Sequence, residues 1–264
     1  MSVGSGSSPP VGLFTGVPQG SVLGPLLFLV FINDLSKTSN FLKYVHFDDD
    51  TTVYVSGPDL GELVEGLNRE LINVDDWLRA NKLSLNLAKT TFMLFTHCLV
   101  PQSLTVTIRD QHIRRVSVAK FLGVIIDEKL TFGSHISSVC KRIARSVGAM
   151  RRISAFMTPA TLLNIYYALV QSHLSYAIKA WGGSAPNHLN RLSSLQNRAL
   201  RLLSSSDNFP DIYAKYRVLT VHSLYSYFCS IKFYKCHVLG HHQFFCSNIC
   251  LLIPSHDHVS QLAF

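Results

Sequence analysis

The chain has 264 residues, of which 47% are hydrophobic and 15% are charged, with six cysteines and a formal net charge of +8 at pH 7. This composition excludes a disordered polyelectrolyte and is typical of a globular chain that buries a substantial core. The excess of basic residues favours an anionic partner without identifying one. The scattered cysteines lack the density of a secreted disulfide scaffold, so we expect reduced thiols in an intracellular protein, in the nucleus or the cytoplasm.

Residues 1–11 are small, polar and proline-containing, and they predict a flexible lead-in without a secretory signal. The next segment, GVPQGSVLGP, interleaves glycine and proline, which predicts tight turns with accessible backbone amides. The apolar run 26–32 then predicts a short helix buried among other elements. It is too short to cross a bilayer, which needs about 20 apolar residues, so we expect no membrane partner.

Two β-rich runs, 41–47 and 51–55, flank Asp48, Asp49 and Asp50. This pattern predicts a β-hairpin with carboxylates at its turn. Adjacent carboxylates repel one another, and a hard divalent cation such as Mg²⁺ or Mn²⁺ would compensate their charge. The alternative is an acidic turn exposed only to solvent.

The GVPQGSVLGPLLF segment followed by the aspartate hairpin resembles motifs B and C of the reverse transcriptases of non-LTR retrotransposons, the jockey-like and LINE-like elements. The resemblance implies that Asp49 is the principal metal-binding carboxylate and that Asp50 is its neighbour. It also implies a loop that faces template and incoming nucleotide, formed by Pro18, Gln19, Gly20 and Ser21. Asp48 departs from the family pattern, which has a small residue at that position, and its charge would perturb the metal site.

The segment after the hairpin predicts a helix that packs against the sheet. Asp59 and Glu62 form a capping-box-like start, and leucines then recur on one face as far as Leu78. Asp75 and Asp76, near the end of this helix, are expected only to face solvent.

Alternation over 83–87, a polar turn and the apolar run 92–95 predict strand, turn, strand. The LNLAKT segment resembles motif D of the family, which makes Lys89 a candidate proton donor to the departing pyrophosphate. The alternative is a turn lysine in solvent. Further on, AKFLGVIID predicts one buried strand over 121–126, where the family has the segment that leads into the thumb.

From His135 the apolar period changes to about 3.6, which predicts a long helix. Thr158 and Pro159 predict the start of a second helix that ends near Trp181, with Leu169 and Tyr176 among its inward positions. A third helix follows Pro186. Basic residues on the outer faces are candidates for nucleic-acid binding, the alternative being a solvated face. They are Lys141, Arg142, Arg145, Arg152, Arg191 and Arg198.

The C-terminal part is less informative. An aromatic segment over 212–234 predicts one or two helices, and a tail rich in cysteine and histidine follows, with Cys236, His237, His241, His242, Cys246, Cys250, His256 and His258. Their spacing fits no standard zinc finger, so we expect no zinc there.

The sequence and the resemblance together predict an α+β fold. A partial polymerase palm, an antiparallel sheet with packed helices, would occupy 12–130 with motifs B to E, and the fingers and motif A would be missing. A helical thumb-like region would cover 131–205, before an uncertain tail at 206–264. The resemblance implies RNA-directed DNA polymerase activity by two-metal nucleotidyl transfer, with Mg²⁺ or Mn²⁺, an RNA template, a DNA primer and dNTP.

We expect that activity to be crippled in this chain, because the first catalytic aspartate has no counterpart in it. The missing N-terminal part of the polymerase, or a self-association partner, would then cover the open palm. The alternatives are a retroelement relic that only binds nucleic acid and a protein-interaction module.

Overall fold

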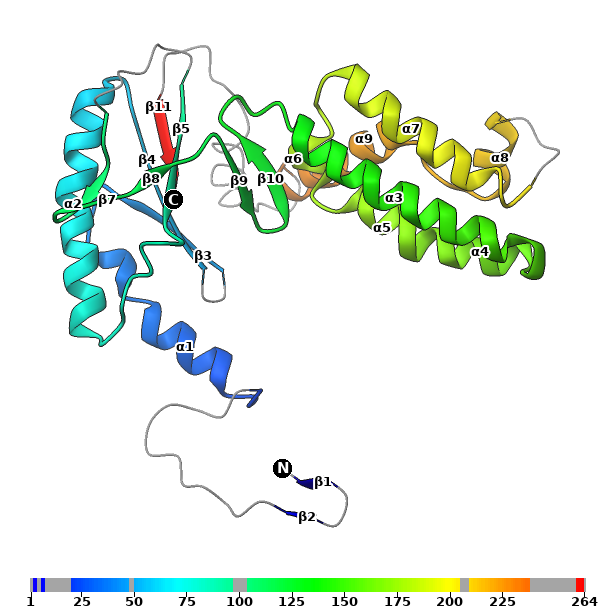
Figure 1. Ribbon diagram of the computed structural model, residues 1–264. Coiled ribbons are helices and arrows are strands. Elements are labelled where there is room, and N and C mark those ends of the chain that lie inside the picture. The colour runs from blue at the N-terminus through cyan, green and yellow to red at the C-terminus, as the bar shows by residue number, and fades with distance from the viewer. Residues whose placement is uncertain are drawn as a thin grey trace. The chain divides into compact units, whose positions relative to one another are not determined.

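The computed structural model describes residues 2–3, 6–7, 20–47, 50–96, 104–204, 209–237 and 260–263, and its elements are labelled in Figure 1. The chain divides into two compact units. Unit 1 comprises Met1–Arg115 with Val259–Phe264, and unit 2 comprises Val116–His258. The mixture of helices and small sheets agrees with the α+β class predicted from sequence. The division falls at 115/116, whereas the sequence analysis placed a change of domain at 130.

Unit 1 is built on a five-stranded sheet of order β3-β4-β11-β5-β8. In chain order its elements are β1 (Ser2–Val3), β2 (Gly6–Ser7), α1 (Gly24–Ile32), the 3-10 turn Leu35–Lys37, β3 (Lys43–Phe47), β4 (Asp50–Gly57), α2 (Leu60–Ala80), β5 (Thr91–Phe95), β6 (Thr107–Ile108), β7 (Gln111–His112), β8 (Arg114–Arg115) and β11 (Ser260–Ala263). Strand β11 lies antiparallel between β4 and β5, so a segment near the C-terminus completes a sheet whose other strands lie between residues 43 and 115.

The predicted hairpin and the helix that follows it are confirmed. Strands β3 and β4 pair antiparallel, and α2 begins where the Asp59 side chain accepts a hydrogen bond from the Glu62 amide at 2.8 Å. The apolar stripe of α2 packs in one core with Val53 and Val55 of β4, and both valines are buried. Figure 1 shows α2 lying along the sheet. Burial of this stripe therefore fixes which face of the hairpin points inward.

Helix α1 forms as predicted, but the prediction that it is buried is wrong. Ile32 is its buried residue, whereas Leu26 is 58% exposed, Val30 is 69% exposed and other apolar side chains of the helix are similarly open. The helix is apolar on nearly every side, so the described part of unit 1 covers only its C-terminal end. No helix among the described residues combines the length and hydropathy that a membrane span requires.

The expected strand at 83–87 is also absent from the structure, where this segment is irregular. It ends in a turn that the Asn86 carbonyl holds by accepting hydrogen bonds from the amides of Lys89 and Thr90. Alternation alone did not suffice for a strand here, because no neighbouring strand pairs with the segment among the described residues.

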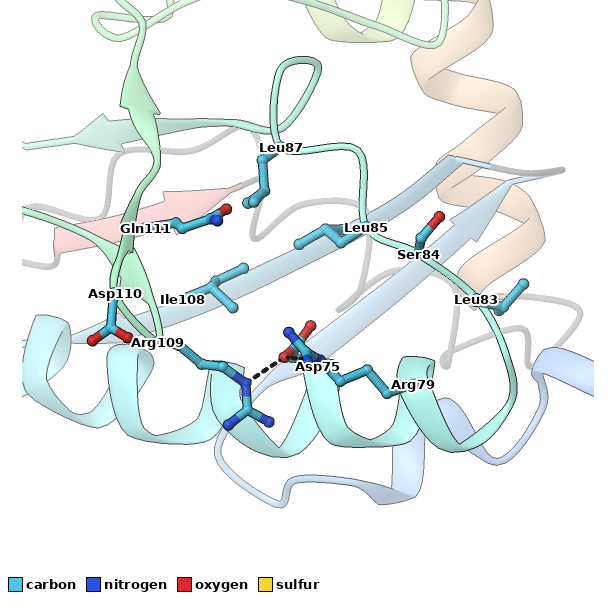
Figure 2. A pocket seen from close by; sticks show the side chains of 10 residues that line it. All are labelled: Asp75, Arg79, Leu83, Ser84, Leu85, Leu87, Ile108, Arg109, Asp110 and Gln111. Carbon is cyan, nitrogen blue, oxygen red and sulfur yellow. Dashed lines mark hydrogen bonds and ion pairs between the residues drawn. The ribbon is translucent and has the colours of Figure 1, made fainter.

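Asp75 has a structural role that the sequence analysis missed. Its carboxylate accepts hydrogen bonds from Nε of Arg79 at 2.8 Å and from Nε of Arg109, at the β6–β7 turn, at 2.6 Å (Figure 2). Arg109 also contacts Asp76. Burial raises the pKa of Asp75, but the hydrogen bonds and charges of the two arginines outweigh burial, and the pKa lies below its ordinary value. This ion pair fastens the β6–β7 hairpin to α2.

Unit 2 is mainly helical. Its elements are β9 (Val118–Phe121), β10 (Val124–Asp127), α3 (Gly133–Ile153), the 3-10 turn Ser154–Phe156, α4 (Pro159–Tyr166), a π-helical turn at Tyr167–Gln171, α5 (Ser172–Ser175), α6 (Ile178–Trp181), α7 (Pro186–Leu200), α8 (Phe209–Lys215) and α9 (Val221–His237). The aromatic segment thus forms two helices, one of the two arrangements expected.

The predicted strand over 121–126 is two strands instead. The chain reverses at Leu122 and Gly123, which both have positive φ (44° and 82°), so β9 and β10 pair as a hairpin. The hydroxyl of Tyr176 donates to the Leu122 carbonyl, which ties this hairpin to the helices of unit 2. A positive φ at leucine is unfavourable in isolation, so no local pattern indicates a turn at Leu122.

The helix starts at Thr158 and Pro186 are confirmed, and the Thr158 hydroxyl accepts from the Thr161 amide at 3.3 Å. The single helix expected as far as Trp181 is broken into α4, the π-helical turn, α5 and α6, with Ala177 at φ 51°. This break turns Leu169 and Tyr176 outward, to 40% and 54% exposure, contrary to the prediction.

Buried polar groups fix the packing of α7 against its neighbours. The fully buried Gln196 donates at 2.9 Å to the Tyr166 hydroxyl and also to the Leu219 carbonyl, and it accepts from the Val221 amide. Because each of these partners would be left unsatisfied by a shift of one helical turn, the network specifies one arrangement of helices.

The Asp75 ion pair makes a testable prediction. Asp75→Asn should lower the free energy of unfolding by about 1–2 kcal/mol near pH 7, since the partner arginines are partly exposed and screened by solvent. A lowered folded-state pKa contributes stability above the ordinary carboxyl pKa of about 4, and this contribution is lost as pH falls through the folded value. Urea unfolding at several pH values should therefore show the difference between wild type and variant shrinking in acid. Asp76→Asn is the matched control, because its carboxylate is 60% exposed, and equal losses for the two variants would contradict this role.

The exposed face of α1 makes a second prediction. Large uncovered apolar surfaces drive association, so the purified chain should self-associate as its concentration rises. The double variant Leu26→Lys with Val30→Lys should increase the monomer fraction in sedimentation velocity and should leave the far-UV circular dichroism unchanged. A wild-type chain that stays monomeric at every concentration tested would show that this face does not drive association.

Candidate functional site

The predicted catalytic carboxylates lie where β3 passes into β4. Phe47 pairs with Asp50 in the antiparallel ladder, so Asp48 and Asp49 connect the two strands. Asp48 and Asp49 lie outside the described residues, whereas Asp50 is described and exposed. Val53 and Val55 face α2, and side chains alternate along a strand, so Asp50 lies on the opposite face of the sheet. Its carboxylate is therefore open to a ligand.

His46, which the sequence analysis did not single out, lies beside this turn. It pairs with Thr51 in the ladder, and its Nδ1 lies 3.2 Å from the Thr51 hydroxyl. Its ring stacks on Tyr44, and its buried Nε2 has no hydrogen-bond partner among the described residues. Burial lowers the pKa of His46, so the imidazole is neutral at physiological pH. Its position opposite Thr51, on the α2-facing side of the hairpin, follows from the pairing register, which no local sequence signal specifies.

The predicted substrate loop is described only in part. Pro18 and Gln19 lie outside the described residues. Gly20 has φ 84°, a left-handed conformation that favours glycine, and a side chain at this position would point into open space. The Ser21 hydroxyl accepts a hydrogen bond from the Gly24 amide at 3.1 Å. One observed role of Ser21 is therefore to cap the first turn of α1.

Lys89 is exposed in the turn that precedes β5, and its backbone amide is held by Asn86. Its ammonium makes no hydrogen bond or ion pair in the described structure. No hydrogen bond or ion pair directly joins Gly20, Ser21, Asp50 and Lys89 either. Among the described residues, no group of three His, Cys, Asp or Glu side chains is arranged to hold a metal ion.

The predicted nucleic-acid-binding residues belong to unit 2. All six are exposed, and none forms an ion pair within the part of the chain that the structure describes. Lys141, Arg145 and Arg152 share one face of α3, and Arg191 of α7 donates from Nη1 to the Ser137 hydroxyl at 3.3 Å. Between positions 133 and 237 the sequence contains only two acidic residues, Asp207 and Asp211, so little negative charge opposes this basic surface.

A larger hollow of about 410 Å³ lies elsewhere in unit 1 (Figure 2). It is lined by the end of α2, the segment 83–87 and the β6–β7 turn, and it contains none of the residues predicted for catalysis. Its two arginines, Arg79 and Arg109, both pair with Asp75, and Arg109 also pairs with Asp76. The geometry therefore supports a structural junction here. Of the eight cysteine and histidine residues in the tail, only the buried Cys236 and the exposed His237 fall within the described residues.

Comparison with known proteins gives a consistent result. Residues 5–126 match the family described as reverse transcriptase (RNA-dependent DNA polymerase). The chain is 30% identical over 220 residues to a probable RNA-directed DNA polymerase from transposon BS of Drosophila melanogaster, an alignment that covers 79% of this chain and 24% of that protein. It is also 30% identical over 201 residues to the RNA-directed DNA polymerase from mobile element jockey of Drosophila funebris, which covers 72% and 22%.

No solved structure matches the chain significantly. The chain spans about a quarter of the length of these two relatives. The matched residues 5–126 include the glycine-rich loop, α1, the aspartate hairpin and Lys89. Residues 5–126 are therefore a reverse transcriptase domain of the kind found in jockey-like, non-LTR retrotransposons.

Proposed function

We propose that the chain contributes to RNA-directed DNA synthesis as part of a polymerase palm, unit 1, followed by a thumb-like helical region, unit 2. In this reaction the primer 3′ hydroxyl attacks the α-phosphate of an incoming dNTP and pyrophosphate departs. The observation that carries the proposal is the pairing of Phe47 with Asp50, because this register places the exposed Asp50 at the start of β4, next in sequence to Asp49.

The residues at the hairpin fit a magnesium or manganese site. Asp50 presents carboxylate oxygens on the exposed face, Asp49 precedes it directly, and Mg²⁺ is commonly held by one or two carboxylates together with substrate phosphates. When bound, the ion would favour ionisation of the primer hydroxyl and offset the charge that develops on the phosphate. The two aspartates would orient it toward the substrate. Asp48 adds a further negative charge that would raise the affinity for cations at the cost of repulsion within the turn.

Other residues of the chain would position substrate and move a proton. Gly20 has no side chain and would let the template or the incoming nucleotide approach the backbone closely. Pro18, Gln19 and Ser21 would belong to the same substrate-binding loop. Lys89, an exposed ammonium with three donors, would give a proton to the departing pyrophosphate. The basic residues on α3 and α7 would hold the template–primer duplex by its phosphates.

Two-metal nucleotidyl transfer uses carboxylates from two strands, and the hairpin supplies one of them. We infer that efficient extension needs a further carboxylate, which the remainder of a longer polypeptide or a second chain would supply. The isolated 264 residues should then bind template–primer but extend it poorly. Template–primer binding and primer extension are therefore expected to differ, and both can be measured on one preparation of the purified chain.

The proposal is tested on the purified full chain by manganese binding and by magnesium-dependent primer extension on an RNA template. Asp49→Asn and Asp50→Asn should each weaken Mn²⁺ binding, followed by electron paramagnetic resonance, on the order of tenfold, because each removes a charged oxygen ligand. Any extension activity should be lost in both variants. Glu65→Gln is the matched control, since Glu65 is an exposed carboxylate on α2, away from the turn.

Two outcomes would count against this function. Equal Mn²⁺ binding by wild type, both aspartate variants and the control would mean that the hairpin is not a metal site. Extension that survives Asp49→Asn would remove that carboxylate from the catalytic step.

A further inference from the structure

Helices α3 and α7 form a groove in unit 2. Gly133 lies against His188 near the start of both helices, and Arg191 reaches Ser137 one turn further on. Arg151 and Arg198 both line one hollow near the other end, so the two helices run parallel, side by side as in Figure 1. The pairing brings together residues that are about 50 positions apart in sequence.

The groove contains a small hollow of about 90 Å³ between Arg151 and Arg198. Its remaining lining is apolar or small, with Ala144, Val147, Gly148 and Leu195. A side chain at Gly148 would meet nothing within 4 Å, so this glycine leaves the space open. The hollow is far below the roughly 300 Å³ of a typical small-molecule pocket, and it therefore suits a group the size of one phosphate.

The charges around the hollow are unopposed. Neither Arg151 nor Arg198 forms an ion pair or a hydrogen bond through its side chain in the described part of the chain, and α3 and α7 contain no Asp or Glu. Arg191 lies two turns before Arg198 on the same face, about 10 Å along the axis. Guanidinium groups bind phosphate oxygens with paired hydrogen bonds, and a line of them favours an extended polyanion over a single ion.

We propose that this groove seats the backbone of a nucleic acid, with one phosphate between Arg151 and Arg198 in the space that Gly148 leaves. The proposal rests on the proposed function and makes it more specific. It assigns a role to Arg151, which the sequence analysis did not choose, and it adds a steric requirement at Gly148. No aromatic side chain lines the hollow, so the contact is independent of base sequence.

The test measures binding of a fluorescently labelled RNA–DNA duplex to the full chain by anisotropy over a range of salt concentrations. Gly148→Leu fills the hollow without changing any charge and should weaken binding about fivefold to tenfold. Arg151→Gln and Arg198→Gln should each reduce the slope of log K against log salt by about one. Inorganic phosphate at constant ionic strength should not displace the duplex.

The controls are Gly148→Ala, which adds one methyl group in open space, and Lys179→Gln, which removes an exposed charge outside the groove. Thermal unfolding verifies that every variant folds. Wild-type chain that binds no duplex would overturn the proposed nucleic-acid function as well. Binding that is unaffected by Gly148→Leu, or lowered equally by Lys179→Gln and Arg151→Gln, would overturn the phosphate seat alone. Displacement by inorganic phosphate would identify a free anion as the ligand and would also overturn it.

Discussion

The pairing register of β3 with β4 is the constraint on which the candidate chemistry depends. Side chains alternate across a strand, so the burial of Val53 and Val55 against α2 commits Thr51 to the inner face and Asp50 to the outer face. A slip of one residue would exchange these faces and would expose both valines. The apolar core of unit 1 thus keeps Asp50 exposed to solvent, although the core residues do not contact it. Stability and site geometry are set here by the same pairs of residues.

The sequence predicted the elements whose signals are local. The hairpin, α2, and the starts of α4 and α7 each carry their own turn, cap or proline. What it missed depends on partners far along the chain. Asp75 seemed suited only to solvent because Arg109 is 34 positions away. The break at Leu122 and Gly123 needs a positive φ at a leucine, which no propensity favours. Strand β11 follows β5 by more than 160 positions, so no local pattern could place it between β4 and β5. For the candidate site, motif resemblance supplied residues, but the exposure of Asp50 and the position of His46 required the ladder.

The two units differ in whether their arginines form ion pairs with carboxylates of the same unit. In unit 1, Asp75 pairs with two arginines and fastens one hairpin to one helix. In unit 2, buried polar contacts such as those of Gln196 fix the packing, so the arginines on the outer faces are not needed for internal ion pairs. Exposed ion pairs contribute little to stability, so the arginines within α3 and α7 lose little by forming none among the described residues. The charge of unit 2 is consequently available to an external anion, which is why a groove between two of its helices is a better place for phosphate than the arginine-lined hollow of unit 1.

Helix α1 connects the predicted substrate loop to the core of unit 1, and its uncovered surface affects how precisely that loop is held. Ser21 caps its first turn, so the loop moves with the N-terminal end of the helix, whereas Ile32 anchors the other end in the core. The nine residues of α1 span about 13 Å, so a small tilt about Ile32 displaces Gly20 and Ser21 by several ångströms. Residues that position a substrate need tolerances nearer half an ångström. A loop held in this manner can position a substrate precisely only when the exposed apolar side of α1 is covered. Covering this side would also remove the apolar surface most prone to association. The position of the loop and the solubility of unit 1 are therefore two consequences of one uncovered helix.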